Sequence, residues 1–141
     1  MRKLIVTAVL ATLGAAVLAA TASASFDRHF TVLAKTTRHQ TADGFRFRER
    51  LFEVGNRGNR VGRDRGRCKI TGRNAVRCRV QVHLNGEVGG FGDIRLAGNL
   101  KPRDRRLNVV GGTRDFNGVA GKLQLSYIHQ SPSRLHFDLV R

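Results

Sequence analysis

The chain has 141 residues, of which 26 are Lys or Arg and 10 are Asp or Glu, for a formal net charge of +16. This length is typical of one domain. With 40% apolar and 26% charged residues, the composition is that of an ordinary globular protein and excludes a collagen-like, fully disordered or multi-span membrane chain. The strong positive charge is unusual and has to be explained by the partners, the compartment or the genome.

The first 24 residues have the pattern of a secretory signal peptide. Arg2 and Lys3 make a cationic start, and residues 4–18 are uncharged and mostly apolar. Residues 22–24, Ala-Ser-Ala, form a small-x-small cleavage site. The apolar run is shorter than the roughly 20 residues that a membrane-spanning helix prefers. We therefore predict a signal peptide at residues 1–24, one exported domain at residues 25–141 and no membrane span in the mature chain, which would be secreted or periplasmic.

Apolar and polar residues alternate along the predicted mature chain with a period of two, which is typical of half-buried β-strands. We expect strands at residues 26–35, 44–54, 59–70, 75–84, 87–98, 106–110, 119–129 and 133–141. The clearest alternation has one apolar face made of Val76, Cys78, Val80, Val82 and Leu84. Because no stretch has the period of a long amphipathic helix, the predicted fold class is all-β.

The connections between these segments are rich in turn residues. Asn85-Gly86 predicts a tight hairpin turn, because both residues tolerate positive φ. That turn would place Ile94 and Val82 on opposite faces, and a β-bulge at residues 89–90 would bring both to the same face. Eight hairpin-linked strands fit a sandwich or a closed barrel, and the barrel is favoured because it removes the exposed edge strands. An eight-stranded barrel is nearly filled by side chains or holds one small ligand.

Cys68 and Cys78 flank a short turn. If the flanking segments are antiparallel strands, the pairing that sets Ile70 opposite Val76 also sets Cys68 opposite Cys78, close enough for a disulfide bond. Two cysteines are too few for a metal site. The histidines show no metal-ligand spacing either: His29, His39, His83, His129 and His136. We predict a disulfide bond and no metal.

A glycine-rich segment at residues 107–121 is the most specific motif. An apolar strand runs into Gly111 and Gly112, where we expect positive φ or close backbone approach. Phe116 is expected to fold back as an apolar plug, with a new strand starting near Val119. The spacing does not fit a phosphate-binding loop, which needs a Lys that this segment lacks.

This segment resembles the VVGGTGxFxGAxG signature of the dirigent and allene oxide cyclase superfamily. The matching residues are Val109, Val110, Gly111, Gly112, Thr113, Phe116, Gly118 and Gly121. Arg114 stands where the signature has a fourth glycine, and Val119 where alanine is common. The order of the other motifs across residues 44–128 is similar to that of small exported bacterial members.

The resemblance implies an eight-stranded antiparallel β-barrel with a central cavity, often assembled into dimers or trimers. One plant branch cyclises an unstable fatty-acid epoxide and another orients phenoxy radicals during coupling, both without a cofactor. Their catalytic residues cannot be matched to this chain, so the catalytic residues are unknown. The leading hypothesis is an exported, cofactor-free barrel that binds a small apolar or phenolic ligand, and whether it guides a reaction, as a cofactor-free cyclase or isomerase, stays open.

Three polar residues lie on apolar faces of the expected strands and are candidate cavity groups. Glu49 and Arg28, if both point inward, would together polarise or protonate a small ligand. A bulge at residues 50–52 would instead turn Glu49 outward into solvent. Tyr127 would either hydrogen-bond a ligand at the cavity mouth or fill the core with its hydroxyl satisfied.

The positive charge is concentrated at residues 46–79, which hold 11 Arg and one Lys against three acidic residues, a balance of +9. Residues 56–67 are expected to be a basic hairpin tip. The alternative function is therefore that of a non-catalytic cationic protein that binds anionic cell-surface polymers or lipids. Nucleic acid is disfavoured, because the aromatic residues fall on buried faces. The arginines equally fit the codon usage of a GC-rich genome.

Overall fold

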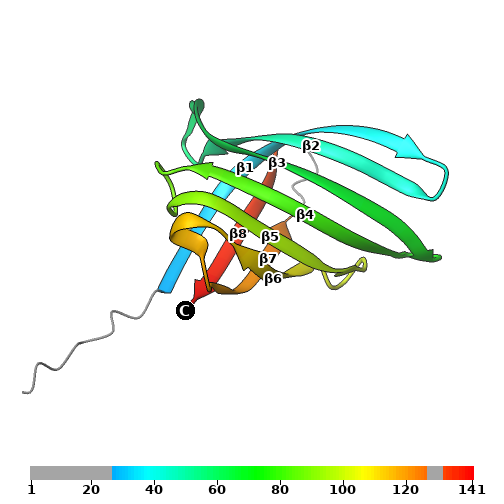
Figure 1. Ribbon diagram of the computed structural model, residues 1–141. Helices are drawn as coiled ribbons and strands as arrows, with labels where there is room; N and C mark the ends of the chain where they lie inside the picture. Colours follow the sequence, from blue (N-terminus) through cyan, green and yellow to red (C-terminus); the bar gives the residue numbers. More distant parts are fainter. Residues whose placement is uncertain (1–26, 127–131) are drawn as a thin grey trace, which may run out of the picture.

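The computed structural model describes residues 27–126 and 132–141. Eight antiparallel strands form a closed barrel in which each strand pairs with the next and the last pairs with the first (Figure 1). The strands are β1 (Asp27–Thr41), β2 (Gly44–Glu53), β3 (Asn56–Gly72), β4 (Ala75–Asn85), β5 (Phe91–Leu100), β6 (Arg106–Gly112), β7 (Ala120–Ser126) and β8 (Ser133–Val140). A short 3-10 turn, η1 (Arg114–Phe116), follows β6. The predicted all-β barrel is confirmed, while the predicted signal peptide and Tyr127 lie outside the described residues.

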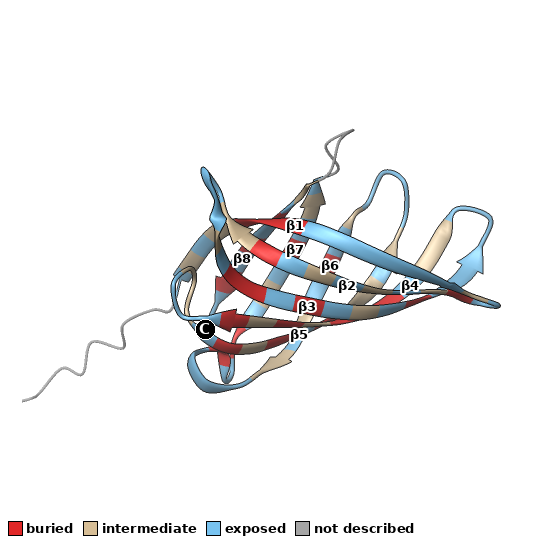
Figure 2. Ribbon diagram, turned by 90° about the horizontal axis from the view of Figure 1, so that it is seen from above, coloured by how far each residue is buried: buried red, intermediate tan, exposed pale blue. Residues whose placement is uncertain are grey.

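Burial alternates along the strands as the sequence pattern predicts (Figure 2). In β4, Cys78, Val80, Val82 and Leu84 are buried, and the residues of the other face are exposed or half-buried, with Arg79 exposed. Side chains fill one end of the barrel almost completely, because two phenylalanines and several leucines and valines lie there fully buried. They include Phe116, Phe137, Leu51, Leu84, Leu139, Val32 and Val61. Space for a ligand is therefore expected towards the opposite end.

The barrel is longer on one side than on the other. β1 pairs with β8 only at residues 27–34, but it pairs with β2 as far as Thr41. The hairpins of β1 to β4 therefore project beyond the other strands (Figure 1). The sequence predicted that the first strand ends at residue 35, because residues 36–40 are all polar and show no alternation; in the structure they are exposed. Pairing with β2 extends this strand, and the projecting hairpins leave that end open.

The connection from β4 to β5 corrects the predicted turn. Residues 86–90 form a five-residue loop in place of a tight turn with a bulge, and Gly86, Gly89 and Gly90 all have positive φ. This loop length sets Val82 opposite Ile94, so both point into the barrel. Registers in hairpins follow loop length, and the longer loop achieves what the predicted bulge was expected to do.

The glycine-rich motif forms the turn after β6 as expected. A side chain on Gly112 would collide with the backbone carbonyl of Phe116, with its Cβ 2.2 Å from that oxygen, so the close approach requires glycine. Phe116 is fully buried, which confirms the predicted plug. Arg114 has φ of 55°, the one non-glycine residue at positive φ among the described residues. This residue therefore adopts the left-handed conformation of the glycine that it replaces in the signature.

We expect Arg114→Gly to raise the free energy of unfolding by about 0.5–1 kcal/mol, since relief of left-handed strain outweighs the added entropy of the unfolded chain. Urea denaturation measures this change. Arg103→Gly is the matched control, because Arg103 lies in an exposed turn with no positive φ and glycine there only loosens the unfolded chain. Equal destabilisation by both substitutions would contradict the proposed strain at Arg114.

Candidate functional site

A small cavity lies inside the barrel towards the projecting hairpins. Its volume is about 80 Å³. Its apolar wall includes Leu100, Leu107, Leu123, Leu125, Val80 and the two cysteines, and its polar groups are Thr36, Arg38, Glu49, Asp64 and Ser133. A water molecule needs only about 10–15 Å³ of such space, whereas drug-sized pockets run to about 300–1,000 Å³. The cavity therefore suits a molecule of a few heavy atoms or one part of a larger one.

Aromatic side chains shape the mouth of this cavity. The ring of Phe47 lies across Gly66 on β3, where a Cβ would come within 2.3 Å of a ring carbon. Phe45 is next along the same face, and the guanidinium carbon of Arg38 lies 4.3 Å from the centre of its ring. Arg38 is exposed and Phe45 half-buried, so a cation over an aromatic ring stands where the interior meets solvent.

Two carboxyl groups face each other at the polar side of the cavity. Glu49 on β2 pairs directly with Asp64 on β3, and Thr36 on β1 donates a hydrogen bond to Oε1 of Glu49. Asp64 is 5% exposed, and its Oδ1 has no hydrogen-bond partner among the described residues. Burial, followed by the hydrogen bond and negative charge of Glu49, raises the pKa of Asp64 to about 10. At neutral pH Asp64 therefore carries a proton, and the cavity contains a neutral carboxyl group with a free oxygen.

The sequence analysis named Glu49 as a candidate but missed Asp64. The register shifts between β2 and β3 occur at residues 51–53, past Glu49, so the bulge that would have turned Glu49 outward does not reach it. Asp64 lies four residues before Cys68 and therefore points to the same side of β3. Counting back by two from Cys68 along the strand would therefore have predicted that Asp64 points into the barrel.

Arg28 does not join this carboxyl pair. It lies eight residues before Thr36 on β1, about 26 Å along the strand, at the filled end of the barrel. There its guanidinium donates a hydrogen bond to the carbonyl oxygen of Gly89. The joint action of Arg28 and Glu49 on one ligand, which the sequence left open, is therefore wrong. The nearest cation to the carboxyl pair in the cavity lining is Arg38, two residues from Thr36.

The disulfide bond forms part of the cavity wall. Cys68 and Cys78 are paired opposite each other on β3 and β4, as predicted, and are bonded. Both cysteines are buried, and both line the cavity. This bond therefore links the two long strands at the wall of the cavity, four residues along β3 from Asp64.

An exposed cluster at the filled end was not expected from sequence spacing. The ring nitrogens of His29 lie 2.7 Å from Oδ1 of Asp27 and 2.8 Å from Oδ1 of Asp138. These three residues come from β1 and β8, and pairing between the ends of the chain brings them together. They offer three ligand atoms within reach of one ion, but all three residues are exposed and the two contacts already satisfy the ring nitrogens of the imidazole.

Within the described ranges, no helix is long and apolar enough to cross a membrane.

Comparison with known proteins gives matches in structure alone. No family model matches the chain, and no curated protein does. A pyocyanin demethylase is similar with a TM-score of 0.60 and 21% identity, covering 79% of this chain and 99% of its own. A pterocarpan synthase dirigent protein is similar with a TM-score of 0.59 and 12% identity, covering 82% of this chain and 87% of its own.

A heme-binding cyclase of neoabyssomicin biosynthesis is also similar, with a TM-score of 0.61 and 15% identity, covering 82% of this chain and 64% of its own. At sequence identities this low, the structural similarity establishes the fold alone, and the activity has to be argued from the site. The chain therefore has the barrel fold of the dirigent proteins, which confirms at the level of fold the resemblance to the dirigent and allene oxide cyclase superfamily.

Proposed function

We propose that this protein binds a small phenolic or otherwise hydroxyl-bearing apolar molecule in the open end of the barrel. The observation that carries the proposal is the unpartnered Oδ1 of Asp64, buried at the polar side of a small cavity whose remaining wall is mostly apolar. Buried polar atoms in folded proteins nearly always have a partner, so this oxygen has an unmet preference for a hydroxyl or a water molecule. A ligand hydroxyl would donate to it while the ring or alkyl part contacts leucines.

The dimensions favour one ring over several. A cavity of about 80 Å³ leaves no room for a multi-ring molecule inside the barrel, although part of one would extend past the mouth towards Phe45 and Arg38. The solved neighbours are named for work on pyocyanin, pterocarpans and a cycloaddition product, which fits a barrel that holds small organic molecules. Binding is the function proposed here, and guiding a reaction of the bound molecule is its extension.

Binding of 4-methylphenol and toluene tests the proposal, because the two molecules differ by one hydroxyl group. We expect 4-methylphenol to bind more tightly, since its hydroxyl meets the carboxyl pair. Leu125 is half-buried and lines the cavity, so the larger side chain in Leu125→Phe should fill part of it and lower the affinity for 4-methylphenol about tenfold or more. Chemical-shift titration of the backbone amides gives both the affinity and the place of binding.

The matched control is Val110→Phe. Val110 is 61% exposed on β6 and does not line this cavity, so its substitution should leave the affinity unchanged. Equal affinity for toluene and 4-methylphenol would mean that the carboxyl pair does not contribute to binding. Unchanged binding by Leu125→Phe, or shifts confined to the outer surface, would place the ligand elsewhere.

Binding to anionic polymers or lipids is the second candidate function. The observation in its favour is that the charge-rich strands β2, β3 and β4 lie side by side and that their arginines are exposed. Disulfide bonds are typical of proteins in oxidising compartments, so the bond between Cys68 and Cys78 agrees with export of the mature chain. Export in turn agrees with both candidate functions. We retain cleavage after residue 24 and a homodimer or homotrimer as parts of the proposal.

A further inference from the structure

The outer surface of the longest strands carries a continuous array of arginines, named here the arginine face. Cross-strand pairing places Arg46 beside Arg67 and Arg67 beside Arg79, and the next row sets Arg48 beside Arg65. Basic side chains therefore stand next to one another both along and across strands β1 to β5. The members are Lys35, Arg46, Arg48, Arg50, Arg63, Arg65, Arg67, Arg79 and Arg95, all exposed.

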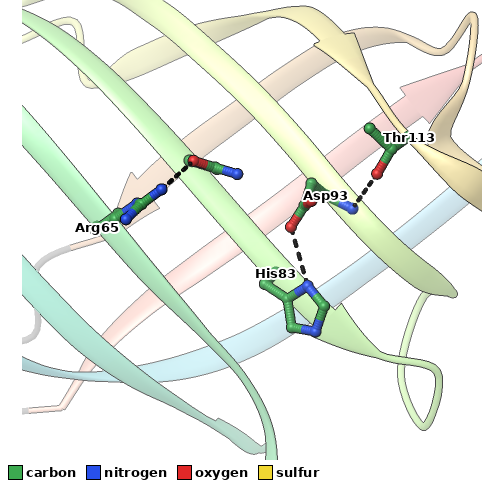
Figure 3. Close-up of polar contacts among 5 residues, drawn as sticks. Arg65, His83, Asp93 and Thr113 are labelled. Carbon is green, nitrogen blue, oxygen red and sulfur yellow. Dashed lines mark hydrogen bonds and ion pairs between the residues drawn. The ribbon is translucent and has the colours of Figure 1, made fainter.

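Acidic residues are few on this face: of the described side chains that line its two clefts, only Glu49, Asp64 and Asp93 are acidic. Glu49 and Asp64 belong to the same strands but point to the interior. The carboxylate of Asp93 lies 2.9 Å from Nδ1 of His83, and the backbone N–H of Asp93 donates to Oγ1 of Thr113 (Figure 3). No ion pair joins any member of the arginine face to an acidic residue in the described parts of the chain.

This arrangement is unfavourable for the isolated protein. Like charges directly opposite each other in a sheet repel, and three rows here contain such pairs. A flexible loop would let these charges move apart, but residues 56–67, which were predicted to be a hairpin tip, lie wholly in β3. The tip itself is at residues 54–55. The arginines are thus held at fixed strand spacings instead of being spread over a loose loop.

Two clefts between these side chains give the face its shape. One has a volume of about 790 Å³ and is lined by Lys35, Arg48, Arg50, Arg63, Arg65 and His83 among others. The second has a volume of about 1,060 Å³ and is lined by Arg46, Arg48, Arg65, Arg67, Arg79 and Arg95 among others. Arg48 and Arg65 line both, and Arg65 is oriented by a hydrogen bond of 3.0 Å to Oε1 of Gln81 (Figure 3). The two clefts therefore adjoin each other at these two arginines.

A linear anionic polysaccharide fits this surface better than the other polyanions. Guanidinium groups bind sulfate, phosphate and carboxylate groups through paired hydrogen bonds. No phenylalanine or tyrosine is a member of the arginine face. Phe47 lines the second cleft, but it is half-buried with its ring across Gly66, so it offers little surface on which a base could stack. Of the large apolar side chains that line the second cleft, Val80 and Leu96 are buried and Phe47 is half-buried. Only Val110 is exposed, as a side chain that inserts into a membrane has to be.

We propose that the arginine face is a docking surface for a linear anionic polysaccharide, with Arg48 and Arg65 at its centre. This inference makes the second candidate function specific and is independent of the cavity. The polysaccharide lies along the two adjoining clefts, and its charged groups supply the ion pairs that the arginines of this face lack among the described residues. Counterions released from the polymer and the protein give the interaction a steep dependence on salt.

The test measures binding of the full mature chain to size-defined heparin and alginate oligosaccharides by calorimetry over a range of NaCl concentrations. The double variant Arg48→Gln, Arg65→Gln is expected to lower the affinity about tenfold and to flatten the slope of log K against log salt concentration by about two. The control Arg103→Gln, Arg134→Gln removes the same charge from exposed positions outside the face and should change the affinity much less. Circular dichroism confirms that both double variants are folded.

Three outcomes would overturn the proposal. Equal losses in the two double variants would mean that net charge alone attracts the polymer. Tighter binding to phosphatidylglycerol vesicles or to DNA than to either oligosaccharide would assign the face to another partner. Affinity without salt dependence would remove the electrostatic basis. Because Leu125→Phe leaves this face intact, normal polysaccharide binding by that variant separates this inference from the fate of the cavity proposal.

Discussion

Replacing both Cys68 and Cys78 by alanine is expected to lower the free energy of unfolding by about 2–4 kcal/mol. The bond closes a loop with a sequence separation of 10, so its removal restores conformational freedom to the unfolded chain. It also removes two buried sulfur atoms from the cavity wall, which loosens the packing there. Thermal denaturation should show a midpoint lower by roughly 10 °C for a chain of this size.

The native protein in the presence of a reductant provides the matched comparison. Once reduced, it should lose nearly as much stability as the double variant, whereas the double variant should not respond to the reductant. The two samples separate the bond from the packing of the sulfur atoms. A double variant as stable as the native protein would mean that barrel closure alone holds β3 and β4 together.

Asp64→Asn is expected to stabilise the protein at pH 7 by about 2 kcal/mol or more, because it removes a buried acid that resists ionisation. The unfolded carboxyl group loses its proton near the ordinary pKa of 3.8, whereas the folded one keeps it up to a pKa of about 10. Between these values the folded state holds one more proton than the unfolded state. The free energy of unfolding of the native protein should therefore fall as pH rises, by up to about 1.4 kcal/mol per pH unit from this group.

The stability difference between Asp64→Asn and the native protein should accordingly grow from pH 4 towards pH 10. Urea denaturation at a series of pH values measures it. Asp43→Asn is the control: hydrogen bonding from Lys69 lowers the pKa of the exposed Asp43, so this substitution should slightly destabilise the protein at neutral pH, and that difference should change only at acid pH, where it disappears. A difference that stays constant with pH would mean that Asp64 is ionised in the folded protein.

Much of the interior could be predicted from alternation. The inward residues of β4 and β8 were identified correctly, because each strand is half-buried and its neighbours in sequence report its two faces. The disulfide bond was also predictable, since its two strands are joined by a short turn. Glu49 was placed on the correct face, but its partner depended on the register between β2 and β3, which includes shifts at residues 51–53.

The position of Arg28 along the barrel could not be predicted from alternation. Alternation places it on the same face as Glu49, and both do lie on inward faces, but alternation carries no information on height along the barrel. The β1–β2 register decides that height: Glu49 stands opposite Thr36, far from Arg28. Likewise, the His29 cluster exists only because the first and last strands pair.

The sequence by itself determined the strands, their inward faces, the disulfide bond and the amount of positive charge, since these depend on local order and on spacings of a few residues. Tertiary structure decided the rest. Loop length and strand register brought Asp64 against Glu49 in a small cavity, left one end of the barrel open and aligned nine basic side chains in one array. The physical reason is that a one-residue change in register turns every side chain of a strand to the other face, and only closure of the whole barrel fixes all eight registers together.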